Sequence, residues 1–168
     1  MVMISGPLKW YTVASTLEQA VYAELSVKPT RHGVVPGLIA WDECDCGLLA
    51  VSVGPIYPTE TFPDPLTRRV GNGCDAPWEA AEIVIQVVRC APNPDDPLTA
   101  PSTLELDTSA REVLTDAYEM MAAVSVKLCE MNQAREISDF MMRSLTPQGP
   151  AGGCVGNELR AVVSLPRN

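Results

Sequence analysis

The sequence predicts an α+β fold, in which two helices cover one face of a four-stranded antiparallel sheet. Two segments place apolar residues at helical spacing, and four others alternate apolar and polar residues as strands do. Their order is helix, strand, strand, helix, strand, strand. Consecutive strands joined by loops favour antiparallel pairing. The chain has 168 residues, 46% of them hydrophobic, which is enough for the core of a single domain spanning 1–168.

Both helices are predicted from spacing, and the second also from a capping signal. Residues 8–26 repeat apolar or small side chains at helical intervals, so 1–37 is expected to form an N-terminal helix and a linker. Ser102 and Glu105 form a capping-box pattern that predicts the start of the second helix. A second helix start at Asp107 is the alternative, and it would divide this helix into two pieces. The core stripe predicted for this helix is Leu106, Ala110, Val113, Leu114, Ala117, Met121, Val124 and Leu128.

Alternation of apolar and polar residues predicts the strands 48–57, 78–90, 137–145 and 158–165. On the second and clearest of them, the residues expected to face the core are Ala81, Ile83, Ile85 and Val87. On the last two strands, the corresponding residues are Phe140, Met142, Leu159, Ala161, Val163 and Leu165. A loop rich in glycine and proline is expected to join these last two strands.

Two further proline-rich segments, 54–77 and 91–101, are predicted to form ordered loops that project from the sheet. Prolines reduce the entropy that such a loop loses when it is fixed, and loops of this length in a small domain are usually functional. Aromatic side chains on rigid loops suit protein–protein contact. The candidates for such contacts are Trp41, Tyr57, Phe62 and Trp78. These features indicate a subunit that acts by assembly.

The charge is acidic and unevenly distributed. The formal net charge is −9, yet residues 42–119 hold fifteen Asp or Glu against four Arg, a net −11, so the remainder sums to +2. Binding of nucleic acid through a basic face is therefore not expected. Neither a signal-peptide pattern nor a run of roughly 18 apolar residues is present, which predicts synthesis in a cytoplasm and no membrane span.

Six cysteines raise the alternative of a metal-binding or redox protein. The only close pair, Cys44 and Cys46, is separated by one residue, whereas structural zinc sites prefer two to four. We therefore expect no metal and no cofactor. Cys90 and Cys129 are predicted to be small core residues. Oxidation after release of the protein from the cell would form disulfides between loop cysteines, and the sequence leaves the pairing open. These cysteines are Cys44, Cys46, Cys74 and Cys154.

No catalytic constellation is recognisable, so the chain is not expected to be an enzyme. The one histidine, His32, lies in a turn-like stretch and is predicted to be a solvated surface residue. The glycine-rich run 149–154 lacks the Lys-Ser/Thr that gives a phosphate-binding loop its contacts. Carboxylate pairs are frequent in so acidic a chain, and none is singled out by an apolar pocket.

Six short motifs are distinctive: Trp41-Asp42-x-Cys44-x-Cys46-Gly47-x-Leu49, Gly54-x-Ile56-Tyr57-Pro58, Cys74-Asp75-Ala76-Pro77-Trp78, Val88-Arg89-Cys90-Ala91-Pro92, Gly149-Pro150 and Cys154-Val155-Gly156-x-Glu158-Leu159-Arg160. This set, which covers most of residues 38–165, resembles neck proteins of long-tailed actinobacteriophages. The predicted order of elements is similar to that of tail terminators, also called tail-completion proteins, within that group. A head-to-tail stopper would be expected to be mainly β-barrel, which fits two long helices poorly.

The resemblance implies a structural virion protein, assembled in the cytoplasm of a bacterial host and located at the head–tail junction. It implies a self-association into a hexameric ring that caps the tail tube, ends its polymerisation and joins the tail to the DNA-filled head. The implied partners are the head-to-tail stopper or connector and the major tail tube protein, while genomic DNA passes through without specific binding. Another neck component, a tail-tube subunit and a plain interaction domain remain as alternatives.

A ring through which DNA passes would benefit from carboxylates that repel phosphate. We therefore expect part of the acidic segment to face the channel, and the candidate lumen acids are Asp42, Glu43, Asp45, Asp95 and Asp96. The two projecting loops are candidates for contact with a neighbouring subunit or partner. Arg68 and Arg69 are isolated among acids and would pair with carboxylates of a neighbour.

Overall fold

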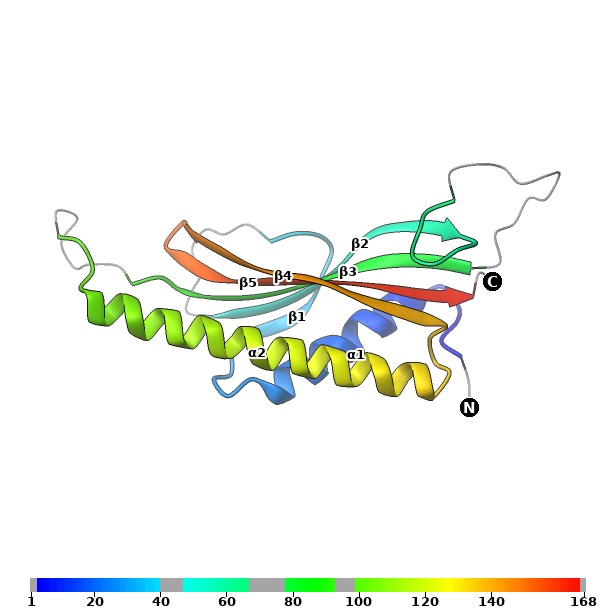
Figure 1. Ribbon diagram of the computed structural model, residues 1–168, viewed down its shortest axis with the longest axis horizontal. Helices are drawn as coiled ribbons and strands as arrows, with labels where there is room; N and C mark the ends of the chain where they lie inside the picture. Colours follow the sequence, from blue (N-terminus) through cyan, green and yellow to red (C-terminus); the bar gives the residue numbers. More distant parts are fainter. Residues whose placement is uncertain (1–2, 40–46, 67–77, 93–98, 167–168) are drawn as a thin grey trace.

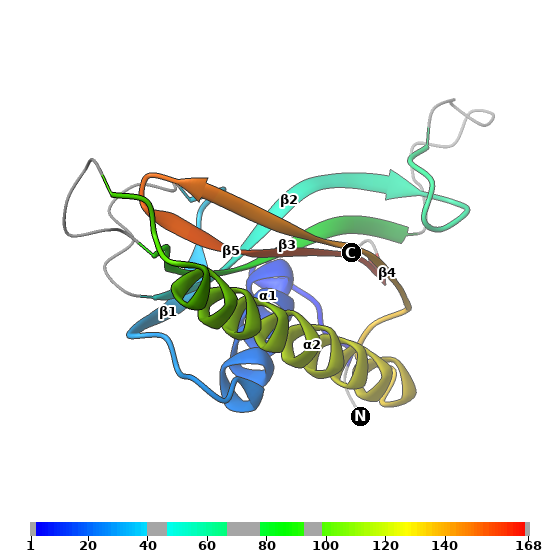
Figure 2. The ribbon, with the colours of Figure 1, turned by 60° about the vertical axis from the view of Figure 1, so that its left-hand side comes forward.

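The computed structural model describes residues 3–39, 47–66, 78–92 and 99–166. They form two helices and a five-stranded sheet in the order β1-β2-β3-β5-β4, and both helices cover the same face of that sheet (Figures 1 and 2). The elements are α1 (Lys9–Glu24), β1 (Arg31–Val35), β2 (Leu48–Thr59), β3 (Trp78–Cys90), α2 (Thr103–Gln133), β4 (Asp139–Ala151) and β5 (Cys154–Pro166). The α+β class and the two helices are confirmed.

The prediction of four antiparallel strands is wrong in one respect, because β1 adds a fifth strand that pairs parallel to β2. This strand has five residues and begins with the polar pair Arg31 and His32. So short a segment carries too little alternation to be distinguished from a linker. The other four strands pair antiparallel, as predicted.

The two hairpins are longer than predicted. β2 continues to Thr59 past a register shift after Val53, although 54–77 was expected to be loop. Its prolines are tolerated because β1 pairs only with the first five residues of β2, which leaves the rest of β2 at the sheet edge. Likewise the expected Gly/Pro loop is largely strand, since β4 is the other edge and the reversal needs only Gly152 and Gly153, both at positive φ.

The core lies between the sheet and the helices. The four predicted core residues of β3 are fully buried, and so are the four predicted on β5. Phe140 and Met142 of β4 are partly buried against this cluster. The contribution of α1 comes from residues at helical spacing, namely Trp10, Val13, Ala14, Leu17 and Val21. Burial of this apolar face is the main driving force for the fold.

The predicted core stripe of α2 is correct only at its last two positions. Val124 and Leu128 are buried, whereas Leu106, Leu114 and Met121 are exposed. The buried positions of this single continuous helix are Asp116, Met120, Val124, Leu128 and Met131. The N-terminal half of α2 has apolar residues on more than one face, so hydrophobic spacing alone does not determine which face is buried. No helix of the described ranges has the length and apolar character that a membrane span requires.

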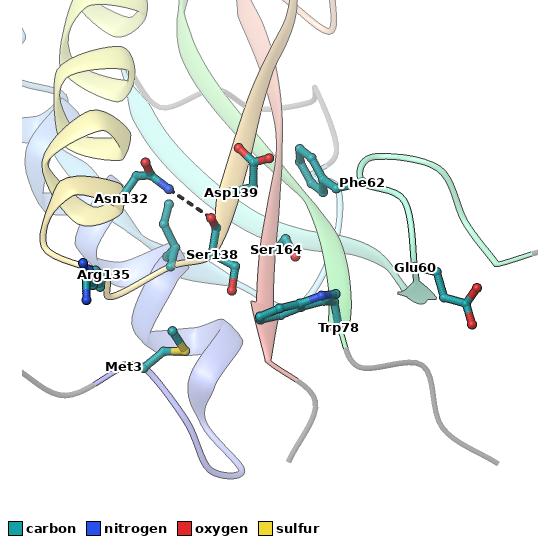
Figure 3. A pocket seen from close by; sticks show the side chains of 10 residues that line it. Met3, Glu60, Phe62, Trp78, Asn132, Arg135, Ser138, Asp139 and Ser164 are labelled. Carbon is teal, nitrogen blue, oxygen red and sulfur yellow. Dashed lines mark hydrogen bonds between the residues drawn. The ribbon is translucent and has the colours of Figure 1, made fainter. Parts of the chain in front are cut away.

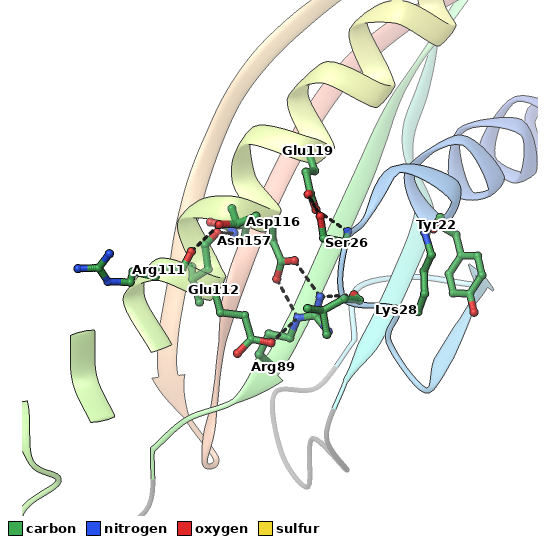
Figure 4. A network of polar contacts seen from close by, with 12 residues as sticks. Tyr22, Ser26, Lys28, Arg89, Arg111, Glu112, Asp116, Glu119 and Asn157 are labelled. Carbon is green, nitrogen blue, oxygen red and sulfur yellow. Dashed lines mark hydrogen bonds and ion pairs between the residues drawn. The ribbon is translucent and has the colours of Figure 1, made fainter. Parts of the chain in front are cut away.

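Polar contacts select the rotation of α2 instead (Figure 4). Arg89 at the end of β3 donates from Nε and Nη2 to the two carboxylate oxygens of Asp116, both at 2.8 Å. The same Nη2 donates to the carbonyl of Val27, 2.7 Å away, which ties the segment after α1 to the pair. Asn157 of β5 donates to the carbonyl of Val113 at 2.7 Å. These bonds join β3, β5, α2 and the α1–β1 connection at one end of the sheet.

The capping box predicted at the start of α2 is present. Ser102 Oγ accepts from the Glu105 amide at 3.3 Å, while the Glu105 carboxylate accepts from the Ser102 amide at 2.7 Å. The opposite end of α2 closes with the Schellman pattern, in which Glu136 N donates to Met131 O and Arg135 N to Asn132 O. Beyond it, Asn132 Nδ2 donates to Ser138 O at 3.1 Å and leads the chain into β4 (Figure 3).

Replacement of Arg89 by Met should lower the free energy of unfolding by about 3–5 kcal/mol, because Asp116 would remain as an unpaired buried carboxylate. Urea denaturation measures this change. The control is Arg111→Met, which removes the exposed Arg111–Asp107 pair and should cost about 0.5 kcal/mol or less. The double variant R89M/D116L should recover most of the loss. Equal stabilities of R89M and R111M would contradict this role of Arg89.

Hydrogen bonds from Ser102 lower the pKa of the exposed Glu105 carboxyl below its ordinary value. A carboxyl with a lowered folded-state pKa stabilises the helix above its unfolded pKa, and this contribution is lost as the pH falls through the folded pKa. In an NMR titration, Ser102→Ala should therefore move the Glu105 midpoint upward. Thr108→Ala removes a hydroxyl that bonds only the Leu104 carbonyl and should leave the midpoint unchanged.

Candidate assembly surface

A pocket of about 520 Å³ lies at the end of the molecule where β3 begins, β5 ends and α2 terminates (Figure 3). We call it the end pocket. Its size lies within the range of roughly 300–1,000 Å³ typical of ligand pockets. The lining residues used below are Glu60, Phe62, Trp78, Asn132, Arg135, Ser138 and Asp139. They come from the β2–β3 connection, from the start of β3, from the last turn of α2, from the segment that follows it and from the start of β4.

Two of the aromatic residues predicted to make contacts, Phe62 and Trp78, are brought together at the end pocket. Trp78 is 37% exposed at the first position of β3, opposite Thr59. Tyr57 does not line the pocket. Its hydroxyl donates to the carbonyl of Pro63 at 2.8 Å, and burial raises its pKa above the ordinary tyrosine value. Tyr57 thus holds in place the segment that carries Phe62.

Arg135 is one of several pocket residues that the sequence did not single out. It occupies the position after the α2 C-cap with a φ of +58°, the left-handed conformation that normally selects glycine. Among the described residues it is the only non-glycine with positive φ. It is exposed, and no carboxylate of the described residues forms an ion pair with it. A side chain in this conformation costs about 1 kcal/mol relative to glycine, so the arginine is not there for the turn.

The end pocket also contains an unsatisfied polar group. The Ser138 hydroxyl is buried and has no hydrogen-bond partner among the described residues. Asp139, next to it, accepts from the amide of Phe140 at 2.8 Å. The pocket therefore combines two aromatic side chains, two carboxylates, one hydroxyl and one guanidinium, and neither the hydroxyl nor the guanidinium has a partner among the described residues. This set fits a protein segment that carries both apolar and charged side chains.

The outer face of α2 is a second candidate surface. Leu104, Leu114 and Tyr118 are exposed by 73%, 65% and 77%, respectively. Asp107 and Arg111 form an exposed ion pair on the same helix, with Arg111 Nε 2.7 Å from Asp107 Oδ2. These five residues recur at intervals of three or four positions and therefore form one face of the helix. We call these five residues the outer stripe of α2. The signal for it was present in the sequence, but Leu114 was assigned to the core.

Several predicted residues lie outside the described ranges. These are the contact candidates Trp41, Arg68 and Arg69 and all five candidate lumen acids, Asp42, Glu43, Asp45, Asp95 and Asp96. Their roles stay predictions. The same is true of Cys44, Cys46 and Cys74, and therefore of the alternative of a cysteine metal site. Within the described part of the chain, no three His, Cys, Asp or Glu side chains gather as a metal site would require.

The predictions for three cysteines are wrong. Cys90 and Cys129, expected in the core, are exposed, while the expected loop residue Cys154 is buried in β5. His32 is exposed, as predicted, but it lies in β1 and not in a turn, with its Nδ1 atom 2.6 Å from Glu18 Oε1. Its ring stacks on Tyr22 with a centroid distance of 3.9 Å. The histidine thus attaches the edge strand β1 to α1, and no nucleophile is involved in the contact.

No family model matches the sequence. No curated protein matches it either. Among solved structures, the chain is similar to the PVC sheath/tube terminator of an extracellular contractile injection system, determined by electron cryo-microscopy in the extended state. The identity is 15% and the TM-score 0.40, and the match covers 93% of this chain but only 55% of that chain. A TM-score at this level transfers no role to the protein.

Arg135→Gly should raise the free energy of unfolding by about 1 kcal/mol, because glycine adopts the left-handed conformation without strain. Arg135→Ala should give no such gain, since alanine retains the Cβ atom that causes the strain. Thermal or urea denaturation compares the two variants. If both changed stability equally, conformational strain at this position would be ruled out.

Proposed function

We propose that this chain is a tail-terminator protein, which forms a closed ring on the head-proximal end of a phage tail tube. The ring, which we expect to contain six copies, ends polymerisation of the major tail tube protein. It then receives the head-to-tail stopper or connector of the DNA-filled head. The protein acts by shape as part of the virion and carries out no reaction.

The observation that carries the proposal is the convergence of the motifs that resemble phage neck proteins. Leu48, which belongs to the first motif region, pairs with Val88 of β3, and Val88 pairs in turn with Gly156 of β5. The Val88–Cys90 motif lies directly opposite Cys154–Gly156. Parts of three of the six motifs, up to about a hundred residues apart in sequence, thus build one end of one sheet, whereas Ile56–Pro58 and Trp78 of two other motifs lie at its opposite end.

The glycines in these motifs have structural reasons. A Cβ atom on Gly156 would collide with the backbone carbonyl of Val87 in the neighbouring strand. Gly149 has a φ of +91°, and a Cβ atom there would lie 2.5 Å from the carbonyl oxygen of Cys154. Arg89, in the adjacent motif, anchors α2. The motifs therefore serve the architecture, which supports a structural role in preference to a catalytic one.

The charge distribution is compatible with passage of DNA. The acidic segment 42–119 includes β2, β3 and the first half of α2. Carboxylates along a channel repel phosphate and prevent DNA from adhering to the wall. We propose that the five candidate lumen acids face this channel, whereas the aromatic residues and Arg68 and Arg69 contact neighbouring subunits.

Negative-stain electron microscopy of the purified protein should show closed rings of uniform diameter. When the protein is mixed with purified tail tubes, one end of each tube should be capped. Tube subunits polymerising in its presence should stop at shorter lengths than in its absence. These results follow because a terminator offers the tube only one face for contact.

Other outcomes would identify the alternatives. Filaments that grow without limit from the protein alone would indicate a tail-tube subunit. Rings that bind connectors but never tubes would indicate a stopper or another neck component. Stoichiometric zinc in the purified protein, held by thiolates, would favour the cysteine-based metal protein.

A further inference from the structure

We propose that the outer stripe of α2 docks into the end pocket of a second copy of this chain, so that neighbouring subunits associate head to tail. This inference rests on the proposed ring and names the two surfaces that build it. The two surfaces are different, and each copy carries one of each. A heterologous contact of this kind generates closed rings or open filaments, unlike the self-complementary contact of a symmetric dimer.

α2 has more apolar surface than its own domain covers. One face is buried against the sheet through Met120, Val124 and Leu128. The outer stripe adds Leu114 and Tyr118, which are about two-thirds or more exposed. A helix that is apolar on two faces is usually covered on both. The described part of this chain places nothing over the second face.

The outer stripe and the end pocket are chemically complementary. The outer stripe presents Leu114 and Tyr118 to solvent, and the end pocket offers the rings of Phe62 and Trp78. The charges match in the same way. Asp107 of the stripe is opposite in sign to Arg135, which forms no ion pair with a carboxylate of the described residues. An arginine retained in a strained turn is explained if a partner uses its guanidinium.

The pocket can also satisfy the positive charge of the stripe. Arg111, which follows Asp107 by one turn, is 78% exposed at its side chain. The end pocket is also lined by Asp139 and Glu60, which carry carboxylates. Docking can therefore exchange one exposed intrahelical ion pair for two pairs between subunits. Like-sign contacts, which would oppose association, are avoided if each charge meets its opposite.

The two surfaces also lie far apart within one chain. The first turn of α2 is at one end of the molecule, and the last turn of α2, the start of β3 and the end of β5, which border the end pocket, are at the other (Figure 1). The stripe and the pocket therefore cannot meet within one chain. Each subunit can instead contact one neighbour through its stripe and another through its pocket, as a ring requires.

The test uses one variant for each surface. Arg135→Asp reverses the pocket charge at a position where aspartate tolerates the left-handed conformation. Leu114→Glu introduces a charge into the stripe at an exposed helix position, where glutamate is a good helix former. Each variant alone should require at least about tenfold more protein for half-assembly than the wild type, as judged by mass photometry. Circular dichroism and the urea midpoint verify that both variants fold.

Two matched controls change the same residue types elsewhere. Arg143→Asp reverses another arginine that lies on β4 and does not line the end pocket. Val126→Glu alters an exposed apolar residue of α2, 58% exposed, that is off the outer stripe. Both controls should assemble as the wild type does. A loss as large as that of the paired variant would attribute the effect to net charge and overturn the assignment.

Mixing the two variants provides the decisive measurement. The R135D copy retains an intact stripe and the L114E copy an intact pocket, so an equimolar mixture should form one-to-one dimers that grow no further. Assembly of either variant at wild-type concentrations would overturn this contact but leave the proposed ring intact. A mixture that stays monomeric would also overturn it. A wild-type protein that never self-associates would overturn the contact and the ring together.

Discussion

The pairing of Arg89 with Asp116 is the constraint on which the arrangement of the helices depends. Both side chains are almost fully buried, with 5% and 3% of their surfaces exposed, so the two charges can be accommodated only together. The bond from Arg89 to the Val27 carbonyl adds the segment that follows α1. Hydrophobic packing would permit α2 to rotate about its axis, because the helix has apolar residues on several faces. The bidentate Arg89–Asp116 ion pair permits only one rotation of α2.

Sequence analysis predicted the parts of the fold that alternation determines. β3 was predicted with its full extent and β5 with all its core residues, because these central strands have the strongest patterns. The edges were harder. Edge strands pair on one side only, so they accept the short polar β1 and the prolines of β2 and β4 that a pattern search assigns to loops. The Arg89–Asp116 pair also explains why the buried face of α2 was predicted incorrectly, since Asp116 is buried at a position where helical spacing predicts an apolar residue.

Only part of the candidate surface was predicted, because composition and spacing identify residue types but not which of them meet in space. Aromatic residues near loops point to contact surfaces by composition alone, which singled out Phe62 and Trp78 without placing them together. Arg135 had no such signal. Its importance comes from a φ angle and from the lack of an ion-pair partner among the described residues, and neither property can be read from the sequence. The outer stripe of α2 was visible as a pattern, but a single chain cannot show which of two apolar faces its own core will use.

In a subunit that associates through both ends of one helix, the position and rotation of that helix must be fixed. The outer stripe lies near the start of α2, and the end pocket is bounded by its last turn, so the angle between the two contacts is built into one rigid element. Displacing the helix by one residue would turn the stripe by about 100° relative to the pocket. A ring closes only if the rotation between neighbours is constant and correct. The buried Arg89–Asp116 pair fixes the rotation of α2 about its own axis. It would therefore determine whether the ring closes, as well as the stability of the domain.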